Sequence, residues 1–114
     1  PRHVIREIMA TAEVVVNLGS IRRAENRHLV NHGEYVSDGS TWGEPFTILD
    51  INPNQSPRRH WDYFVVSDGT TFLAEAWRKS GRYQNDSATI TDGGVFGGTY
   101  PFWFYLTIRR ICGS

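Results

Sequence analysis

This chain of 114 residues has a single cysteine, no net charge and no long apolar run. Cys112 has no partner for an internal disulfide, so we expect a fold without disulfide bridges. That suits a reducing compartment but also occurs in secreted proteins, so the compartment stays open. No apolar run approaches the roughly 20 residues that cross a bilayer as a helix, so we expect no transmembrane segment. Twelve basic residues balance twelve acidic ones, which argues against a general nucleic-acid binder.

The composition that remains is typical of one small globular domain, which we place at residues 1–114. Hydrophobic residues make up 39% of the chain and aromatic residues 13%, enough to build a core. All but one of the basic residues are arginine, the exception being Lys79. Arginine suits bidentate contact with carboxylate or phosphate and stacking on rings. The alternative explanation for the excess of arginine over lysine is a compositional bias of the source genome.

Apolar residues near the start follow a helical spacing. Between residues 4 and 16 they recur at intervals of three and four, which predicts an amphipathic helix. The β-branched run 14–16 favours a strand, so we expect a short helix over 2–11 followed by a strand that ends at Gly19. A continuous first strand is the alternative. Residues 20–33 are polar and weakly periodic, which indicates a charged edge strand or an irregular crossing.

The rest of the chain predicts short strands separated by Gly, Asn, Asp and Pro. The expected strands are 35–42 with a turn at Asp38-Gly39, 45–51, 60–66, 71–77, 87–91 and 100–110. The strongest local pattern is a hairpin of 60–66 and 71–77 around Asp68-Gly69. The predicted fold class is therefore mainly β, an antiparallel β-sandwich or small barrel with a short N-terminal helix.

The predicted hairpin brings two carboxylates together. With Asp68 and Gly69 as the loop, Asp62 lies opposite Glu75 and His60 opposite Trp77, while the other face is entirely apolar. Facing carboxylates repel unless a cation or a shared proton relieves them. We therefore name Asp62, Glu75 and His60 as candidate catalytic residues. The alternative is that both carboxylates are solvated, or neutralised by the nearby arginines Arg58, Arg59 and Arg78.

The aromatic run 100–110, if it is a strand, has two different faces. One face is a core row, consisting of Tyr100, Phe102, Phe104, Leu106 and Ile108. The other face carries Trp103, Tyr105, Thr107 and Arg109, whose rings would stack on a ligand or be buried against another sheet or subunit. The candidate ligand-binding residues are therefore Trp77, Arg78, Trp103, Tyr105 and Arg109.

Two further patterns have simple alternatives. His28 and His32 have a spacing that binds metal only in a helix, and we expect surface histidines, with no metal site and no cofactor. The N-terminal helix, with arginines on one face and Ile, Val and Met on the other, fits a membrane surface. A helix that covers one end of a sandwich has the same pattern, and we favour that interpretation.

Three functional hypotheses follow. The first is a non-enzymatic, lectin-like module that holds a glycan or other small polar ligand by stacking and by hydrogen bonds from Asp, Glu and Arg. The second is a small β-rich enzyme that uses Asp62, Glu75 and His60 in an aromatic-lined pocket. The third is a structural or assembly protein whose aromatic face lies in the interface of a homo-oligomer.

Overall fold

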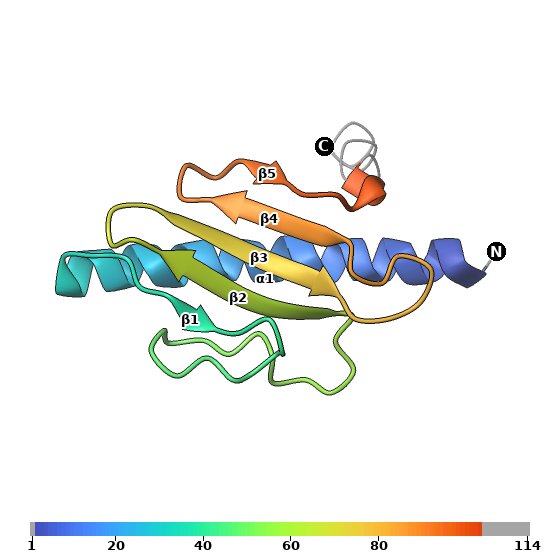
Figure 1. Ribbon diagram of the computed structural model, residues 1–114, viewed down its shortest axis with the longest axis horizontal. Coiled ribbons are helices and arrows are strands. Elements are labelled where there is room, and N and C mark those ends of the chain that lie inside the picture. Colours follow the sequence, from blue (N-terminus) through green and yellow to red (C-terminus); the bar gives the residue numbers. More distant parts are fainter. Residues whose placement is uncertain (1, 104–114) are drawn as a thin grey trace.

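One long helix lies across a single antiparallel sheet in the computed structural model, which describes residues 2–103, the side chains of residues 2, 3 and 103 excepted (Figure 1). The elements are α1 (Arg2–His32), β1 (Asp38–Gly39), β2 (Trp61–Ser67), β3 (Phe72–Arg78), β4 (Ser87–Thr91), β5 (Phe96–Gly97) and the 3-10 turn η1 (Pro101–Trp103). The strands lie side by side in chain order, and each pairs antiparallel with the next. Within residues 2–103 there is one open sheet.

The antiparallel sheet and the N-terminal helix confirm the coarse prediction of fold class, but the helix is far longer than predicted. It has 31 residues, more than the five described strands together, so "mainly β" overstates the strand content. The strand predicted at 14–19 and the edge strand or irregular crossing predicted at 20–33 are both wrong. A second helical spacing, made of Ala10, Val14, Leu18 and Ile21, is fully buried, and this packing outweighs the strand preference of Val14–Val16.

The helix ends at a glycine. Gly33 has φ +81°, and its amide donates to the Leu29 carbonyl at 2.8 Å. This left-handed residue just past the last turn is the common way to finish a helix. Gly19, which we expected to end the first strand, lies inside the helix at a cost of roughly 0.5–1 kcal/mol relative to Ala.

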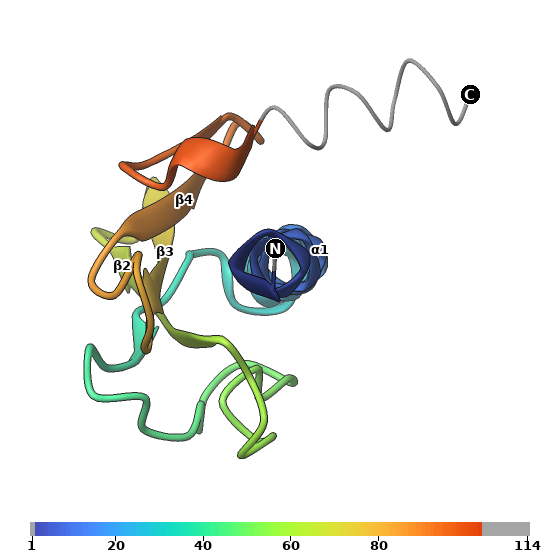
Figure 2. The ribbon, with the colours of Figure 1, turned by 90° about the vertical axis from the view of Figure 1, so that its right-hand side faces the viewer.

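Small side chains let α1 lie close to the sheet. Ala74, Ala76 and Ala88 are completely buried on the inner face of β3 and β4. The larger core residues around them are Val14, Leu18, Ile21, Trp61, Tyr63, Val65, Phe72 and Ile90. Viewed along α1, the sheet lies on one side of the helix, and no described segment lies on the opposite side (Figure 2).

The predicted hairpin is confirmed, with a register that differs by two residues. Asp62 lies opposite Trp77, and Phe64 lies opposite Glu75. The loop contains four residues instead of two, because Asp68 accepts hydrogen bonds from the amides of Thr70 and Thr71 and closes a wider turn. A shift of two preserves the faces, so the apolar face is in the core as predicted.

The strand predicted at 45–51 is absent. The amides of Thr47, Ile48 and Leu49 donate to the carboxylate of Asp38, at 3.0, 2.9 and 2.8 Å. Since these amides are satisfied by a side chain, they have no need of a strand partner. Within 35–42 the turn predicted at Asp38-Gly39 is wrong, because these two residues are the strand β1. The strand predicted at 87–91 is confirmed as β4.

The described start of the predicted aromatic strand 100–110 is a 3-10 turn, and 104–110 lie outside the described residues. Tyr100 and Phe102 are nevertheless buried, as the core row predicted. The Tyr100 ring meets Trp61 edge-on at 4.7 Å between centroids, and Phe102 meets Tyr83 at 4.8 Å. This aromatic cluster closes the core near the N-terminal end of α1.

Candidate functional site

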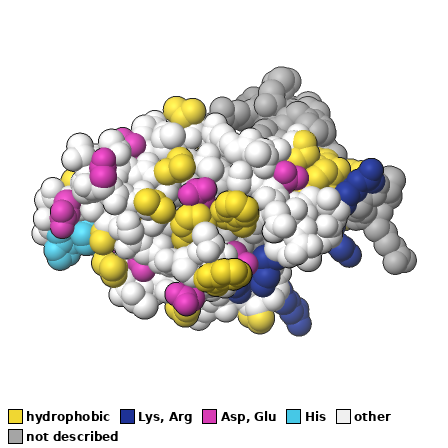
Figure 3. Space-filling model, viewed as in Figure 1, with side chains coloured by type: hydrophobic (Ala, Val, Ile, Leu, Met, Phe, Trp, Pro, Cys, Tyr) yellow, Lys and Arg dark blue, Asp and Glu magenta, His cyan; other side chains and the backbone are white. Residues whose placement is uncertain are grey.

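The sheet face away from α1 has a hollow that is lined by three of the predicted site residues, Asp62, Trp77 and Arg78. Strand alternation turns Asp62 and Trp77 to this outer face, and pairing places them directly opposite each other. Figure 3 looks onto this face, where hydrophobic, acidic and basic side chains lie close together. The hollow measures about 350 Å³, and both residues line it together with Arg78.

One wall of the hollow comes from the segment after β1, which carries Trp42. Gly43 has φ +76°, and a Cβ at this position would collide with the Asp62 carboxylate and the Arg59 guanidinium. Glycine is therefore the favoured residue at this close approach to β2, because a Cβ would displace the two side chains and strain the backbone. The passage of this segment places Trp42, whose side chain is 86% exposed, at the rim of the hollow.

The opposite wall is the connection from β3 to β4, which contributes Lys79, Gln84 and Asn85. It is closed by two backbone hydrogen bonds, from the Arg78 amide to the Asp86 carbonyl and from the Asn85 amide to the Arg78 carbonyl, each 2.9 Å. Asn85 has φ 72°, a conformation that Asn tolerates better than most residues. The wall is therefore a defined turn.

Two of the three charged residues that line the hollow are each neutralised by an ion pair. Asp62 accepts a hydrogen bond from Arg59 at 2.8 Å, and Arg78 pairs with Glu7 at 2.8 Å beneath the sheet. Lys79 forms no side-chain ion pair with any residue in the described part of the chain. The hollow thus offers one uncompensated positive charge.

The three candidate catalytic residues lie in different surroundings. His60 turns toward α1, where its Nδ1 lies 2.9 Å from Glu13 Oε1. Glu75 faces outward opposite Phe64, and burial raises the pKa of its carboxyl. Asp62 is held by Arg59. No hydrogen bond or ion pair links Asp62, Glu75 and His60 to one another within residues 2–103.

The remaining predicted ligand residues are Trp103, Tyr105 and Arg109. Tyr105 and Arg109 lie outside the described residues, as does the side chain of Trp103. Their proposed stacking and charge contacts stay predictions.

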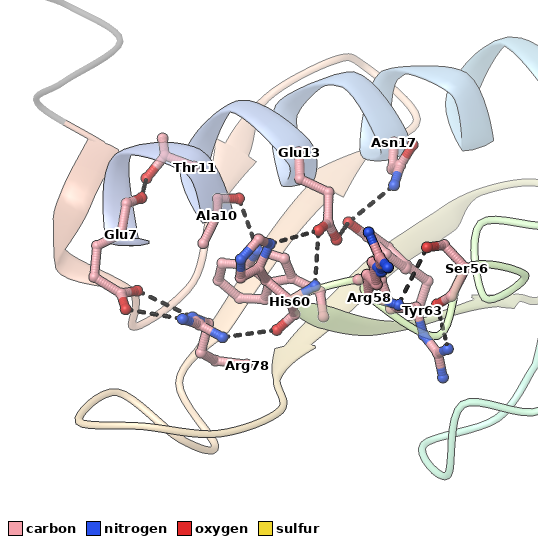
Figure 4. A network of polar contacts seen from close by, with 12 residues as sticks. Glu7, Ala10, Thr11, Glu13, Asn17, Ser56, Arg58, His60, Tyr63 and Arg78 are labelled. Carbon is pink, nitrogen blue, oxygen red and sulfur yellow. Dashed lines mark hydrogen bonds and ion pairs between the residues drawn. The ribbon is translucent and has the colours of Figure 1, made fainter. Parts of the chain in front are cut away.

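A buried polar network fastens α1 to the sheet (Figure 4). Arg78 donates to both carboxylate oxygens of Glu7, at 3.0 and 2.8 Å, and to the His60 carbonyl at 2.9 Å. Burial opposes ionisation of Glu7, but hydrogen bonds from Arg78 and Tyr100 and the charge of Arg78 outweigh it, so the pKa of Glu7 is lowered. Trp61 adds a hydrogen bond from its indole to the Ala10 carbonyl at 2.8 Å.

A second group in the network centres on Glu13. One of its oxygens accepts from the His60 amide at 2.7 Å, and the other from the Tyr63 hydroxyl at 2.7 Å. Burial, followed by the charge of Glu13, raises the pKa of Tyr63. Asn17 donates to the same hydroxyl at 3.1 Å. These contacts fix the rotation of α1, so the side of the helix that faces away from the sheet is equally fixed.

That outer side of α1 is apolar over its first half. We call Ile5, Met9, Ala12 and Val16 the outer seam. Their spacing of four, three and four residues places them on one side of a helix with about 3.6 residues per turn. Ile5, Met9 and Val16 are 62%, 58% and 62% exposed, although their counterparts on the inner side are buried. Beyond the seam the same side carries Arg23 and Arg27.

The condition for a metal-binding histidine pair is met, because His28 and His32 lie in the last turns of α1. Their ring centroids are 4.3 Å apart, and His28 Nδ1 lies 2.8 Å from the Glu34 carbonyl oxygen. In the part of the chain that the structure describes, no group of three or more His, Cys, Asp and Glu side chains could hold a metal ion.

Sequence reasoning missed that the outer seam is exposed, and it missed Trp42. The seam residues belong to the apolar spacing of residues 4–16, which we expected to cover one end of a sandwich, and this assignment is wrong: the apolar residues that pack on the sheet are Ala10, Val14, Leu18 and Ile21. Trp42 follows Asp38-Gly39 at a distance of three residues and carries no sequence pattern that joins it to Asp62. No helix in residues 2–103 has the length and hydropathy to span a membrane.

Comparisons with protein-family models, with curated proteins and with solved structures each found no match to this chain.

Proposed function

We propose that this protein is an assembly subunit that associates with further copies of itself through the outer seam of α1. The observation that carries the proposal is a long helix with apolar residues on two opposite sides in its first half. One side is occupied by the sheet, whereas the outer seam leaves three large apolar side chains more than half exposed. Contiguous exposed apolar residues of this kind mark interaction surfaces.

The spacing of the seam favours another helix as its partner. Intervals of four and three are those at which two helices interdigitate their side chains, and α1 of a second copy carries the same seam. The balance of twelve basic and twelve acidic residues favours this choice, because copies of a chain without net charge do not repel one another at long range.

The size of the seam predicts the strength of the association. From Ile5 to Val16 it extends about 16 Å along the helix. Four side chains cover far less than the roughly 1,200 Å² of a stable pairwise interface. Association is therefore expected to be weak for each pair and to depend on concentration or on several copies acting together.

Sedimentation velocity from about 10 µM to about 1 mM tests the proposal. The wild-type protein should form larger species as concentration rises, and Val16→Lys should remain monomeric. Val66→Lys is the matched control, because Val66 is 53% exposed but lies on the sheet face away from α1, and it should behave as wild type.

Two results would overturn the proposal. One is a wild-type protein that stays monomeric over the whole range. The other is a monomer that binds anionic lipid vesicles and loses this binding in Val16→Lys, because the seam would then face a membrane surface.

A further inference from the structure

We infer that the hollow between Trp42 and Trp77 is a binding site for an acidic saccharide, meaning a sugar ring that carries a carboxylate. The inference is independent of self-assembly, because the hollow lies on the sheet face opposite α1. It narrows the hypothesis of a small polar or glycan ligand to one place and one ligand chemistry.

The two tryptophans supply the apolar part of such a site. They come from separate segments, the loop after β1 and strand β3, yet line one hollow, and they are 86% and 37% exposed. Large rings gain most of their stabilisation from burial, so two exposed indoles in one depression lack the usual reason to be there. The face of a sugar ring bears C–H groups that pack on an indole, while its edge bears hydroxyls.

The polar part lies between and beside the rings. Lys79, Gln84 and Asn85 line the hollow, and none of their side chains forms a hydrogen bond to another residue within 2–103. Asp62 uses one carboxylate oxygen for Arg59, and its other oxygen has no partner in the same range. Amide, ammonium and carboxylate groups together can both donate to and accept from hydroxyls. A volume of about 350 Å³ lies at the small end of ligand sites and suits one or two sugar rings.

Charge selects an acidic sugar over a neutral one. Asp62 and Arg78 are already neutralised by Arg59 and Glu7, so Lys79 sets the net charge of the hollow. Because Lys79 is partly exposed, its preference for an anion is modest and falls as salt rises.

Titration with digalacturonic acid, monitored by the indole N–H resonances in NMR, tests the inference, with maltose as the neutral comparison. We expect a Kd of about 1 mM for the acidic sugar and binding about tenfold weaker for maltose at low salt. Lys79→Gln should lower the affinity for digalacturonic acid to that for maltose. Trp42→Ala should weaken the binding of both sugars about tenfold or more.

The control variant is Arg82→Gln, which removes an exposed cation from the same turn without touching the hollow and should bind as wild type. The inference is overturned if digalacturonate shifts no indole resonance, or if Trp42→Ala binds unchanged. It is also overturned if acetate or inorganic phosphate alone matches the acidic sugar, because the site would then recognise an anion without a sugar ring. Trp42 is so exposed that its substitution leaves the fold intact, and an unchanged backbone spectrum verifies this.

Discussion

The buried pair of Glu7 and Arg78 gives the sharpest test of how α1 is held. The change is Arg78→Met, which keeps an unbranched apolar chain of similar length and removes the charge. The Arg78 side chain is 1% exposed and makes three hydrogen bonds, two of them to Glu7, which is itself 2% exposed. Removing one partner of a buried ion pair costs about 3–5 kcal/mol, because the remaining charge stays buried without compensation.

Urea denaturation followed by circular dichroism measures this loss. A cost of about 4 kcal/mol and a slope of about 2 kcal/mol/M predict a midpoint about 2 M lower than that of the wild type. The double variant Glu7→Leu/Arg78→Met should recover most of the loss, since it leaves no buried charge. The matched control is Arg27→Met, which breaks an equally close but solvent-exposed pair, Arg27 with Asp50, and should change the midpoint little.

The pH dependence has a definite sign. The pKa of Glu7 is lowered in the folded protein, so its contribution to stability is present above the unfolded value of about 4.5 and is lost as the pH falls through the folded value. In Arg78→Met, burial acts on Glu7 without the arginine, and its pKa should rise. The difference between wild type and variant should therefore shrink on acidification. An Arg78→Met midpoint no lower than that of Arg27→Met, or a double variant as unstable as the single one, would refute this account.

Three further changes test other parts of the fold. Asp38→Ala should cost about 3 kcal/mol in urea denaturation and expose the amides of 47–49 to hydrogen exchange, and retained protection would contradict it. Burial raises the pKa of Glu25, so the contribution of this residue to stability is present below about pH 4.5 and is lost as the pH rises through the folded pKa. Glu25→Gln should abolish this loss of stability. An unchanged dependence of stability on pH in Glu25→Gln would contradict the prediction. Gly39→Ala should lower the free energy of unfolding by at least about 1 kcal/mol more than Gly33→Ala, because both residues have positive φ but only a Cβ at Gly39 meets the Phe46 ring. Equal urea midpoints for the two variants would show that backbone strain alone determines the cost.

The sequence predicted local pairing better than the long helix. The Asp68-Gly69 hairpin and the strand 87–91 were recognised because alternation and turn residues lie within a few positions of one another. The helix was cut short at the run 14–16, where strand propensity and helical spacing disagree. Propensity differs by less than 1 kcal/mol per residue, so burial of Val14 and the residues that follow it decides the conformation.

The candidate site was only partly predictable for a related reason. Asp62 and Trp77 were placed on the same outer face because a register error of two residues preserves the faces, although it changes the opposing pairs. Trp42 could not be joined to them from the sequence. Its position depends on Gly43 passing over Asp62, a tertiary contact that no local pattern encodes.

The alignment of α1 with the sheet has a mechanical consequence. The helix is about 46 Å long by its rise per residue, and β2, β3 and β4 run nearly along it (Figure 1). Tension applied along the helix axis therefore loads the Glu7, Ala10 and Glu13 contacts in shear, all at once. A force perpendicular to the axis would peel them apart one after another. Under axial load the helix and the sheet should therefore separate in a single cooperative step.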